Sequence, residues 1–232
     1  MPDLRPVLEL VDAEPRALPG TAVHVALSLA IRPGEFVMVQ CGDAAQAASF
    51  ADICCGLWPL SRGIVRFFGR DWTALPDAYV AALRGRIGRV FGDGGWIDFL
   101  DMEANILLPQ LHHTREDIAE LRVVAAELGC AFGLPGLPSC KRSELSAADL
   151  AGAAFIRAFL GEPLLVILES PLQGRTAEFS VPLLTAIARA RDHDAAVLWL
   201  TVGDAVWSDR LTPATARLRL TERGLAMVRR FA

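Results

Sequence analysis

Short, wholly apolar runs recur along this chain of 232 residues, and they constrain its fold more than any other feature. The runs Phe36–Val39 and Leu164–Leu168 contain no polar side chain. They are too short to cross a membrane, which takes about 20 apolar residues. Runs of this length are typical of strands that are buried on both faces, as in a parallel sheet.

Strands and helices are expected to alternate along most of the chain. A turn signal at Arg32–Glu35 precedes the strand at 36–40, and a loop is expected at 41–46. Thr114 is expected to cap a helix. This order predicts an α/β fold with an open, mostly parallel sheet and an inserted helical part. The other expected strands are 4–12, 22–31, 63–69, 86–91, 164–168, 196–201, 217–220 and 226–229, and the helices are 47–57, 77–84, 102–107, 114–128, 147–160 and 181–190.

Composition excludes several function classes. The net charge is −4 and no basic run is present, so nucleic-acid binding is not expected. The five cysteines include no Cys-x-x-Cys pair, which favours reduced thiols over a metal site. Met1–Arg5 contains no apolar segment of the kind found in secretion signals, and a cytoplasmic protein is expected. Lys141 is the single lysine of the chain.

A series of short motifs resembles the ATP-binding subunit of ABC transporters across almost the whole chain. The resemblance implies one ABC ATPase-like domain, 1–232, with a P-loop NTPase-like core at 1–91 and 161–232 that includes an antiparallel N-terminal β part. It also implies a Q-loop region and a helical signature subdomain at 92–160. The motifs are Pro33-Gly34-Glu35, Cys41-Gly42, Gly56-Leu57, Ser61-Arg62-Gly63, Phe68-Gly69-Arg70, Val90-Phe91-Gly92-Asp93, Met102–Ile106, Glu144–Asp149 and Leu164–Pro171.

The segment from Gly42 to Ser49 lies where the resemblance implies a phosphate loop. Such a loop needs glycines whose backbone N–H groups hold phosphates, a lysine that neutralises them, and a Ser or Thr for Mg²⁺. Here the lysine position falls on Ala47 or Ala48, and Asp43 adds a negative charge. Ser49 is expected to be a small packed residue rather than a metal contact.

The residues that would hydrolyse ATP are also replaced. Glu169-Ser170 stands where the resemblance implies an Asp that holds Mg²⁺ and a Glu that polarises the attacking water. Gly92 takes the place of the Q-loop glutamine, and Val202 takes the place of the switch histidine. The aromatic residue that would stack on adenine, expected near 17–19, is absent. No cofactor is therefore expected, with ATP and Mg²⁺ bound only if the altered site still binds them.

The signature segment departs from the family pattern as well. In the family it faces the ATP of a partner subunit, and its glycines permit close approach to the phosphate. Ala147 and Ala148 replace these glycines, and Asp149 places a carboxylate that would repel phosphate. Ser146 either contacts phosphate or caps the following helix, and capping is the favoured interpretation.

The Q-loop region and the helix after it form the family's docking groove for a membrane subunit. Apolar residues in this segment are expected to be exposed for docking, although ordinary subdomain core is an equal alternative. The expected docking residues are Trp96, Phe99, Leu100 and Met102, with Ile97 beside them.

These observations favour a catalytically degenerate nucleotide-binding subunit that docks on a membrane permease at the inner face of the membrane. It is expected to form a homodimer or to pair with another ATPase subunit. The motifs Trp96–Leu100 and Leu107–Pro109 look like those of bacterial lipid importers that work with MCE-type proteins. One alternative is a soluble regulatory or scaffold protein with only the fold. Another is a weak ATPase, for which Arg62 and Arg66 are the candidate replacement cations.

Overall fold

The computed structural model describes residues 5–172, 180–204, 207 and 212–230. Residues 1–4, which include the start of the first predicted strand and most of the segment considered for a secretion signal, lie outside this range. A six-stranded sheet forms the centre of the molecule, and its neighbours are parallel except for β10 on β9. Its order is β10-β9-β3-β8-β7-β6, built from β3 (Phe36–Cys41), β6 (Ile87–Val90), β7 (Leu165–Glu169), β8 (Ala196–Val202), β9 (Ala216–Thr221) and β10 (Gly224–Arg230).

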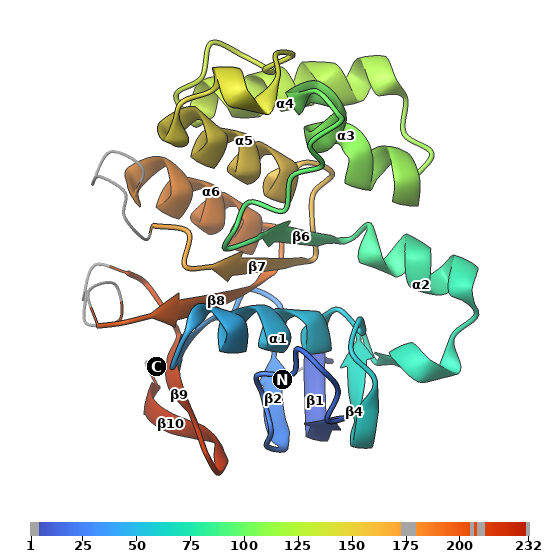
Figure 1. Ribbon diagram of the computed structural model, residues 1–232, viewed down its shortest axis with the longest axis vertical. Helices are drawn as coiled ribbons and strands as arrows, with labels where there is room; N and C mark the ends of the chain where they lie inside the picture. Colours follow the sequence, from blue (N-terminus) through green and yellow to red (C-terminus); the bar gives the residue numbers. More distant parts are fainter. Residues whose placement is uncertain (1–4, 173–179, 205–206, 208–211, 231–232) are drawn as a thin grey trace.

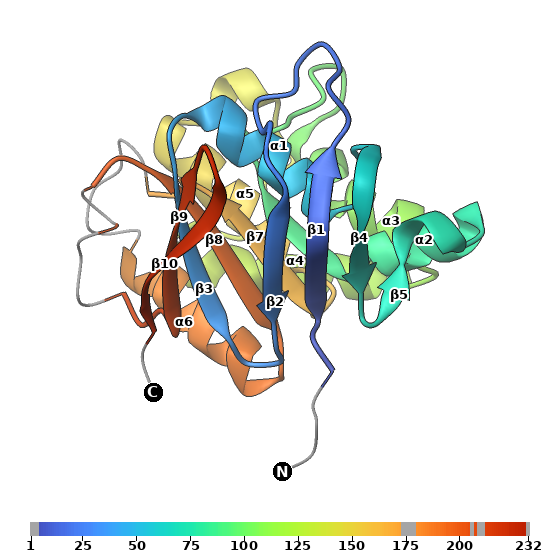
Figure 2. The same cartoon turned by 90° about the horizontal axis from the view of Figure 1, so that it is seen from below.

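A second sheet, antiparallel and four-stranded, contains most of the N-terminal segment (Figure 2). Its order is β2-β1-β4-β5, from β1 (Leu8–Pro15), β2 (Leu27–Ile31), β4 (Leu60–Phe67) and β5 (Arg70–Asp71). The predicted α/β fold, with a mostly parallel sheet and an antiparallel N-terminal part, is confirmed.

The helices divide between the two faces of the six-stranded sheet (Figure 1). Helix α1 (Ala44–Cys54) packs between the two sheets, and α2 (Asp77–Arg84) follows a short 3-10 turn at Trp72–Ala74. On the other face, α5 (Ala147–Phe159) and α6 (Ser180–Asp192) pack against the sheet. Helices α3 (Met102–His113) and α4 (Ile118–Ala131) pack on α5, and a second 3-10 turn lies at Arg142–Glu144. No helix in the described part of the chain combines the length and apolar composition that crossing a bilayer requires.

The central strands are buried on both faces, as their apolar runs predict. Successive side chains of a strand point to opposite faces of the sheet. In β7, Leu165 and Ile167 join the core around α1, whereas Val166 and Leu168 join the core under α5 and α6. A sheet with helices on both faces needs this continuous apolar pattern.

Several predicted helix boundaries are wrong. The helix expected at 47–57 is α1, which runs from Ala44 to Cys54. Helix α3 was expected to end at residue 107, but it continues through Pro109 to His113 at the cost of one backbone hydrogen bond. The next helix was expected to begin at Thr114. It begins at Ile118, because the Asp117 carboxylate accepts hydrogen bonds from the backbone N–H groups of residues 119 and 120.

Candidate functional site

The carboxyl ends of four parallel strands lie side by side, and the segments that resemble ATP-binding motifs follow them. Cys41 at the end of β3 is in register with Val202 on β8, and Glu169 on β7 is in register with Leu200. The backbone N–H of Gly92, just past β6, donates to Glu169 Oε2 at 3.3 Å. Ligands of open α/β sheets bind at such an edge.

The segment after β3 forms no open loop of the kind predicted for 41–46, because α1 already begins at Ala44. The Asp43 carboxylate caps this helix by accepting a hydrogen bond from the Gln46 N–H at 2.8 Å. Alanine and glutamine have high helix propensity, so an Asp followed by this composition starts a helix early. The Gln46 side chain folds back, and its Oε1 accepts from the Gly42 N–H at 2.9 Å.

The residues at the lysine and Ser/Thr positions lie within the first two turns of α1. Ala47 is buried and Ala48 is half-buried, and neither carries a charge. Ser49 is also buried, and its Oγ accepts a hydrogen bond from the Ala22 N–H at 3.2 Å. Ser49 therefore ties α1 to the segment between β1 and β2.

Arg89 is the residue at this site that the sequence interpretation missed. Its Nε donates to Glu169 Oε1 at 2.6 Å, and its Nη1 donates to Asp52 Oδ1 on α1 at 2.6 Å. Its guanidinium also lies over the Phe91 ring, 4.3 Å from the centroid, and Nη2 donates weakly to the Ala48 carbonyl at 3.4 Å. One buried cation thus joins β6, β7 and α1.

Strand alternation explains why Arg89 and Glu169 meet. Ile87 packs on the α1 side of the sheet, and Arg89, two residues later, points the same way. Glu169 follows Leu165 and Ile167 onto that face. The available signal was an arginine in a short strand at a position that the alternation places under a helix, where a charge needs a partner.

Burial raises the pKa of Glu169, while the Arg89 guanidinium and the Gly92 N–H oppose the rise. The neighbouring Ser170 has a left-handed backbone with φ of 43°, and its N–H donates to the Leu200 carbonyl at 2.7 Å. The Ser170 Oγ is buried without a hydrogen-bond partner among the described residues. Ser170 is therefore held in place by its backbone rather than by its hydroxyl group.

The two arginines considered as replacement cations point elsewhere. Arg62 and Arg66 lie on β4 in the four-stranded sheet and pair with Glu14 and Glu9 of β1. The signature segment also lies apart from these strand ends, at the start of α5. There Ser146 caps the helix as expected, because its Oγ accepts the N–H of the residue three positions later.

Asp149 completes the cap of α5. Its Oδ2 accepts hydrogen bonds from the Ser146 N–H at 3.3 Å and from the Ser146 hydroxyl at 2.7 Å. This reciprocal arrangement is a capping box. Ala147 and Ala148 form the first turn of the same helix. The hydroxyl group and the carboxylate of this segment are thus both engaged within the chain.

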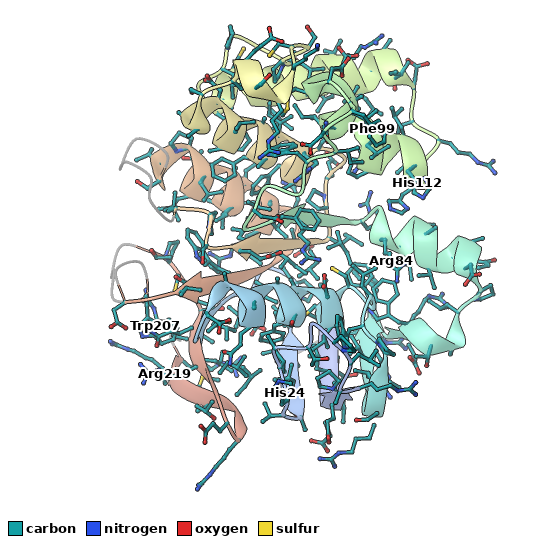
Figure 3. All side chains as sticks on the ribbon, in the orientation of Figure 1. His24, Arg84, Phe99, His112, Trp207 and Arg219 are labelled. Carbon is teal, nitrogen blue, oxygen red and sulfur yellow. The ribbon has the colours of Figure 1, made fainter. Side chains whose placement is uncertain are left out.

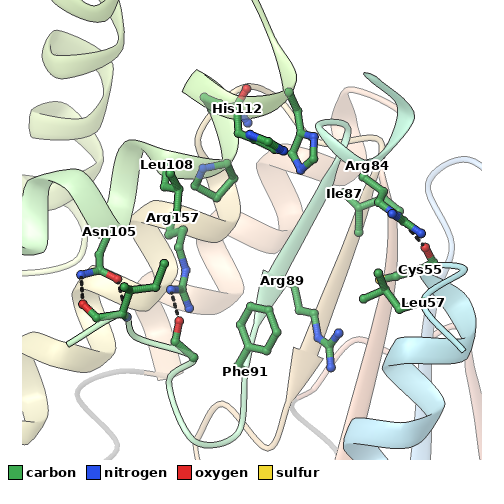
Figure 4. Close-up of a pocket in the computed structure, with 15 residues that line it drawn as sticks. Cys55, Leu57, Arg84, Ile87, Arg89, Phe91, Asn105, Leu108, His112 and Arg157 are labelled. Carbon is green, nitrogen blue, oxygen red and sulfur yellow. Dashed lines mark hydrogen bonds between the residues drawn. The ribbon is translucent and has the colours of Figure 1, made fainter. Parts of the chain in front are cut away.

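A pocket of about 390 Å³ opens beside Arg89, between the end of α1, α2, β6, α3 and α5 (Figure 4). The segment between β6 and α3 forms part of its wall. Asn105 holds this segment, since its Oδ1 accepts from the Ile97 N–H at 2.8 Å and its Nδ2 donates to the Ile97 carbonyl at 3.0 Å. Asn105 is 2% exposed, so this is a buried brace.

The expected exposure of the docking segment is only partly correct. Phe99 is 88% exposed, and Trp96 and Leu100 are half-buried. The prediction is wrong for Met102, which is fully buried because it begins α3 and packs into the core under α5. The role of the exposed residues in docking stays a prediction.

Metal ligands are not gathered anywhere in the described residues: no group of three or more His, Cys, Asp or Glu side chains is placed to hold an ion. The three cysteines at 41, 54 and 55 are buried. Burial raises the pKa of Cys41 to about 12 and that of Cys55 to about 11, so both are protonated thiols at neutral pH.

Comparison with known proteins identifies the architecture. No protein-family model matches the chain. It is 26% identical over 212 residues to the macrolide export ATP-binding/permease protein MacB of Chlorobium luteolum, covering 89% of this chain and 32% of that protein. It is 29% identical over 185 residues to the lipoprotein-releasing system ATP-binding protein LolD 1 of Rhodopirellula baltica, covering 77% and 79%. The chain thus spans about a third of the MacB protein that it matches.

The intermembrane phospholipid transport system ATP-binding protein MlaF of Haemophilus influenzae is 23% identical over 170 residues, which cover 73% of this chain and 64% of that protein. Among solved structures, the dimeric ATP-binding cassette MJ0796 bound to ADP and phosphate superposes with a TM-score of 0.80 at 18% identity, covering 97% of this chain and all of that one. The chain therefore has the fold of an ABC ATPase cassette and is similar in sequence, over most of its length, to the ATP-binding subunits of ABC transporters.

Proposed function

We propose that the chain is a catalytically silent nucleotide-binding subunit of an ABC transporter. The observation that carries this proposal is the state of the phosphate loop. Helix α1 begins at Ala44, so no open loop remains, and the Gly42 N–H is taken by the Gln46 side chain. Asp43 adds a carboxylate where phosphate would bind, and no lysine is available to offset it.

The arrangement of Glu169 supports the same proposal. A carboxylate that accepts hydrogen bonds from Arg89 and from the Gly92 N–H has its charge and lone pairs engaged within the chain. The residue after it is a serine, which cannot act as a general base at neutral pH. These residues do not fit Mg-ATP, and no hydrolytic step is assigned to them.

The similarity to transporter subunits supports a membrane permease as the main partner. MJ0796 was solved as a dimer, which supports pairing with a second copy or with a competent ATPase subunit. In this proposal the chain lies at the cytoplasmic face of the membrane. Lipid import with MCE-type partners stays a prediction, because MlaF is no more similar than the relatives named for macrolide export and lipoprotein release.

Thermal unfolding with and without millimolar Mg-ATP tests the proposal. A ligand at about 100 times its dissociation constant adds about 2.7 kcal/mol of stability. We expect no shift for this chain, and a clear shift for MJ0796 as a positive control. A shift, followed by ATP turnover that Glu169→Ala abolishes, would establish the weak-ATPase alternative instead.

Affinity purification from the native membrane tests the second half of the proposal. We expect the full-length protein to recover a permease subunit. Recovery of soluble proteins alone, with no permease or ATPase subunit, would favour a regulatory or scaffold protein that has kept only the fold.

A further inference from the structure

The pocket between α2, β6, α3 and α5 is lined by basic side chains but by no acidic one. Although the chain has a net charge of −4, no Asp or Glu in the described part of the chain lines this pocket. Arg84 on α2 and His112 on α3 face it from two helices (Figure 3). Its wall also includes the apolar side chains of Ile87 and Pro109. The pocket therefore presents positive charge beside an apolar surface.

Three arginines line the pocket, and they differ in their partners. Arg89 is neutralised by two carboxylates, those of Glu169 and Asp52. Arg84 donates to the backbone carbonyl groups of residues 55 and 56 at 3.2 Å and 2.8 Å. Arg157 donates to the carbonyl groups of residues 94 and 95. Among the described residues, no carboxylate forms an ion pair with Arg84 or Arg157.

Buried polar atoms without a hydrogen-bond partner gather at the same pocket. Gln110 is 5% exposed, and its Nε2 donates to the Leu160 carbonyl at 3.0 Å. Its Oε1 accepts no hydrogen bond from any described residue. The His113 Nδ1 and the Arg157 Nε are buried in the same state, and all three side chains line the pocket. Buried polar groups are normally hydrogen-bonded, so three such atoms around one cavity point to a bound molecule.

Several of these side chains converge on Gly85, at the end of α2. Gln110 and His113 are three residues apart on α3 and therefore share one face of that helix. The Gln110 Nε2 lies 3.4 Å from the Gly85 carbonyl oxygen, and a Cβ atom at Gly85 would lie 2.7 Å from the His113 Cβ. Burial, His112 and the nearby charge of Arg84 together lower the pKa of His113. A cation, an unpartnered acceptor and an imidazole thus lie together at one end of the pocket.

This arrangement selects a ligand by its chemistry. A carboxylate at Arg84 supplies the opposite charge that the pocket lacks. A hydroxyl group supplies the donor that the Gln110 Oε1 lacks. A basic ligand would be repelled, whereas water would bond to the polar atoms but leave the apolar wall wetted. A planar ring that carries both groups covers this wall and loses little conformational entropy on binding.

We propose that this pocket binds a small aromatic acid that carries a hydroxyl group. Its carboxylate lies at Arg84, its hydroxyl group donates to the Gln110 Oε1, and its ring lies against Ile87 and Pro109. The pocket volume of about 390 Å³ lies within the range of small-molecule sites, roughly 300 to 1,000 Å³. This ligand goes beyond the proposed function and does not depend on it, because its binding requires neither a permease nor a second subunit.

The three hydroxybenzoate isomers are suitable probes, because they place the hydroxyl group at three different distances from the carboxylate. Binding of each isomer to the purified full-length chain is measured by isothermal titration calorimetry. We expect at least one isomer to bind. Its amide, which has no charge, should bind at least about tenfold more weakly, because the charge-assisted hydrogen bond to Arg84 is lost.

Benzoate tests the second contact. It should bind about fivefold more weakly than the hydroxybenzoate, because the Gln110 Oε1 is left without a donor. Binding by none of the three isomers, or equal binding by the acid and its amide, would overturn the proposal.

Removing the charge of Arg84 tests the position of the carboxylate. Arg84→Gln should weaken binding of the hydroxybenzoate at least about tenfold and remove most of the preference for the acid over the amide. Arg70→Gln, which changes an exposed arginine on β5, is the matched control and should keep that preference. A thermal melt establishes that each variant is folded. A folded Arg84→Gln variant that still prefers the acid would reject the assigned position.

A second pair of variants tests whether the acid binds in this pocket. Leu108 lines the pocket and is 37% exposed, whereas Leu111, one turn further along α3, does not line it and is 42% exposed. Leu108→Asp brings a negative charge to the pocket and should weaken binding of the acid about threefold or more. Leu111→Asp brings the same charge to a position outside the pocket and should change the affinity less than about twofold. Equal effects of the two variants would mean that the acid binds elsewhere on the chain.

Discussion

Arg89 forms the most strongly connected charge cluster of the described chain. Its side chain is 8% exposed and that of Glu169 is 5% exposed, so each depends on the other for solvation. Breaking a buried pair by removing one partner is far more damaging than replacing both, because an uncompensated charge remains. This asymmetry provides a direct test of the cluster.

Arg89→Met should lower the free energy of unfolding by about 3 kcal/mol at neutral pH, measured by urea denaturation. Combining it with Glu169→Gln should recover more than half of the loss. Arg142→Met removes an exposed pair with Asp98 and should cost less than about 1 kcal/mol. Equal losses for the single and double variants would show that Glu169 does not depend on Arg89.

The loss in Arg89→Met should also depend on pH. The pKa of Glu169 lies above its ordinary value of 4.5, so folding favours the protonated form more than the unfolded chain does. Without Arg89 this pKa rises further. The destabilisation caused by burying the Glu169 charge is absent at a pH below its pKa in the unfolded chain and complete above its pKa in the folded protein. The loss of unfolding free energy in Arg89→Met should therefore shrink as the pH falls from about 7.5 to about 5. A deficit that grows on acidification would contradict this account.

At the residue scale, the sequence predicted where the altered motifs would lie but not how they would be connected. The contact of Gly92 with Glu169 follows from the strand order that the resemblance implies. The role of Arg89 depends on which face of β6 it occupies and on Asp52, two turns into a different element. Such a three-way contact is set by packing between distant segments, and no local pattern specifies it.

At the scale of elements, the start of α1 is the feature with the greatest effect on the site. Asp43 was interpreted through its charge, whereas the structure shows it as the N-cap. An aspartate at this position can either repel phosphate or cap a helix, and the sequence alone does not show which of the two roles applies. The boundary errors at Pro109 and Thr114 have a related cause, because tertiary packing decides where a helix with several possible ends stops.

Variants of Asp43 test this helix start. Asp43→Ala should lower the free energy of unfolding by about 1 kcal/mol, because the Gln46 N–H loses its acceptor. Asp43→Asn retains a capping oxygen and should cost only a few tenths of a kcal/mol. The two are compared by chemical denaturation. Similar losses for both variants would mean that charge, rather than capping, is what Asp43 contributes.

At the scale of the whole molecule, the fold depends on close contact between the sheet and the helical layer. A Cβ atom at Gly88 would lie 1.7 Å from the Ala158 carbonyl oxygen, so β6 and α5 approach as closely as backbones allow. The predicted layers and the mostly parallel sheet needed only the apolar runs and the alternation of elements. The apolar runs and the alternation of elements do not predict this backbone contact, since nothing in the sequence distinguishes Gly88 from any other glycine in a strand.

Gly88→Ala should therefore lower the melting temperature strongly, at a cost of about 3 kcal/mol, because the obstructing atom is backbone and cannot rotate away. Gly92→Ala is the matched control on the same segment. Its added Cβ would meet Glu169 at 3.8 Å, an ordinary contact, and the variant should unfold within about 0.5 kcal/mol of wild type. A tolerated Gly88→Ala would mean that β6 and α5 lie farther apart.

The contacts of Arg89 with Glu169 and Asp52 hold β6, β7 and α1 together without a bound ligand. A cassette braced by a diffusible nucleotide loosens when the cell runs short of it, whereas a guanidinium attached to the backbone has a local concentration that never falls. The same cation forms part of the wall of the pocket between α2, β6 and α3. In an assembly of the proposed kind, the conformation of this subunit would not depend on the nucleotide concentration in the cell. The conformational changes of a transport cycle would then originate in another component.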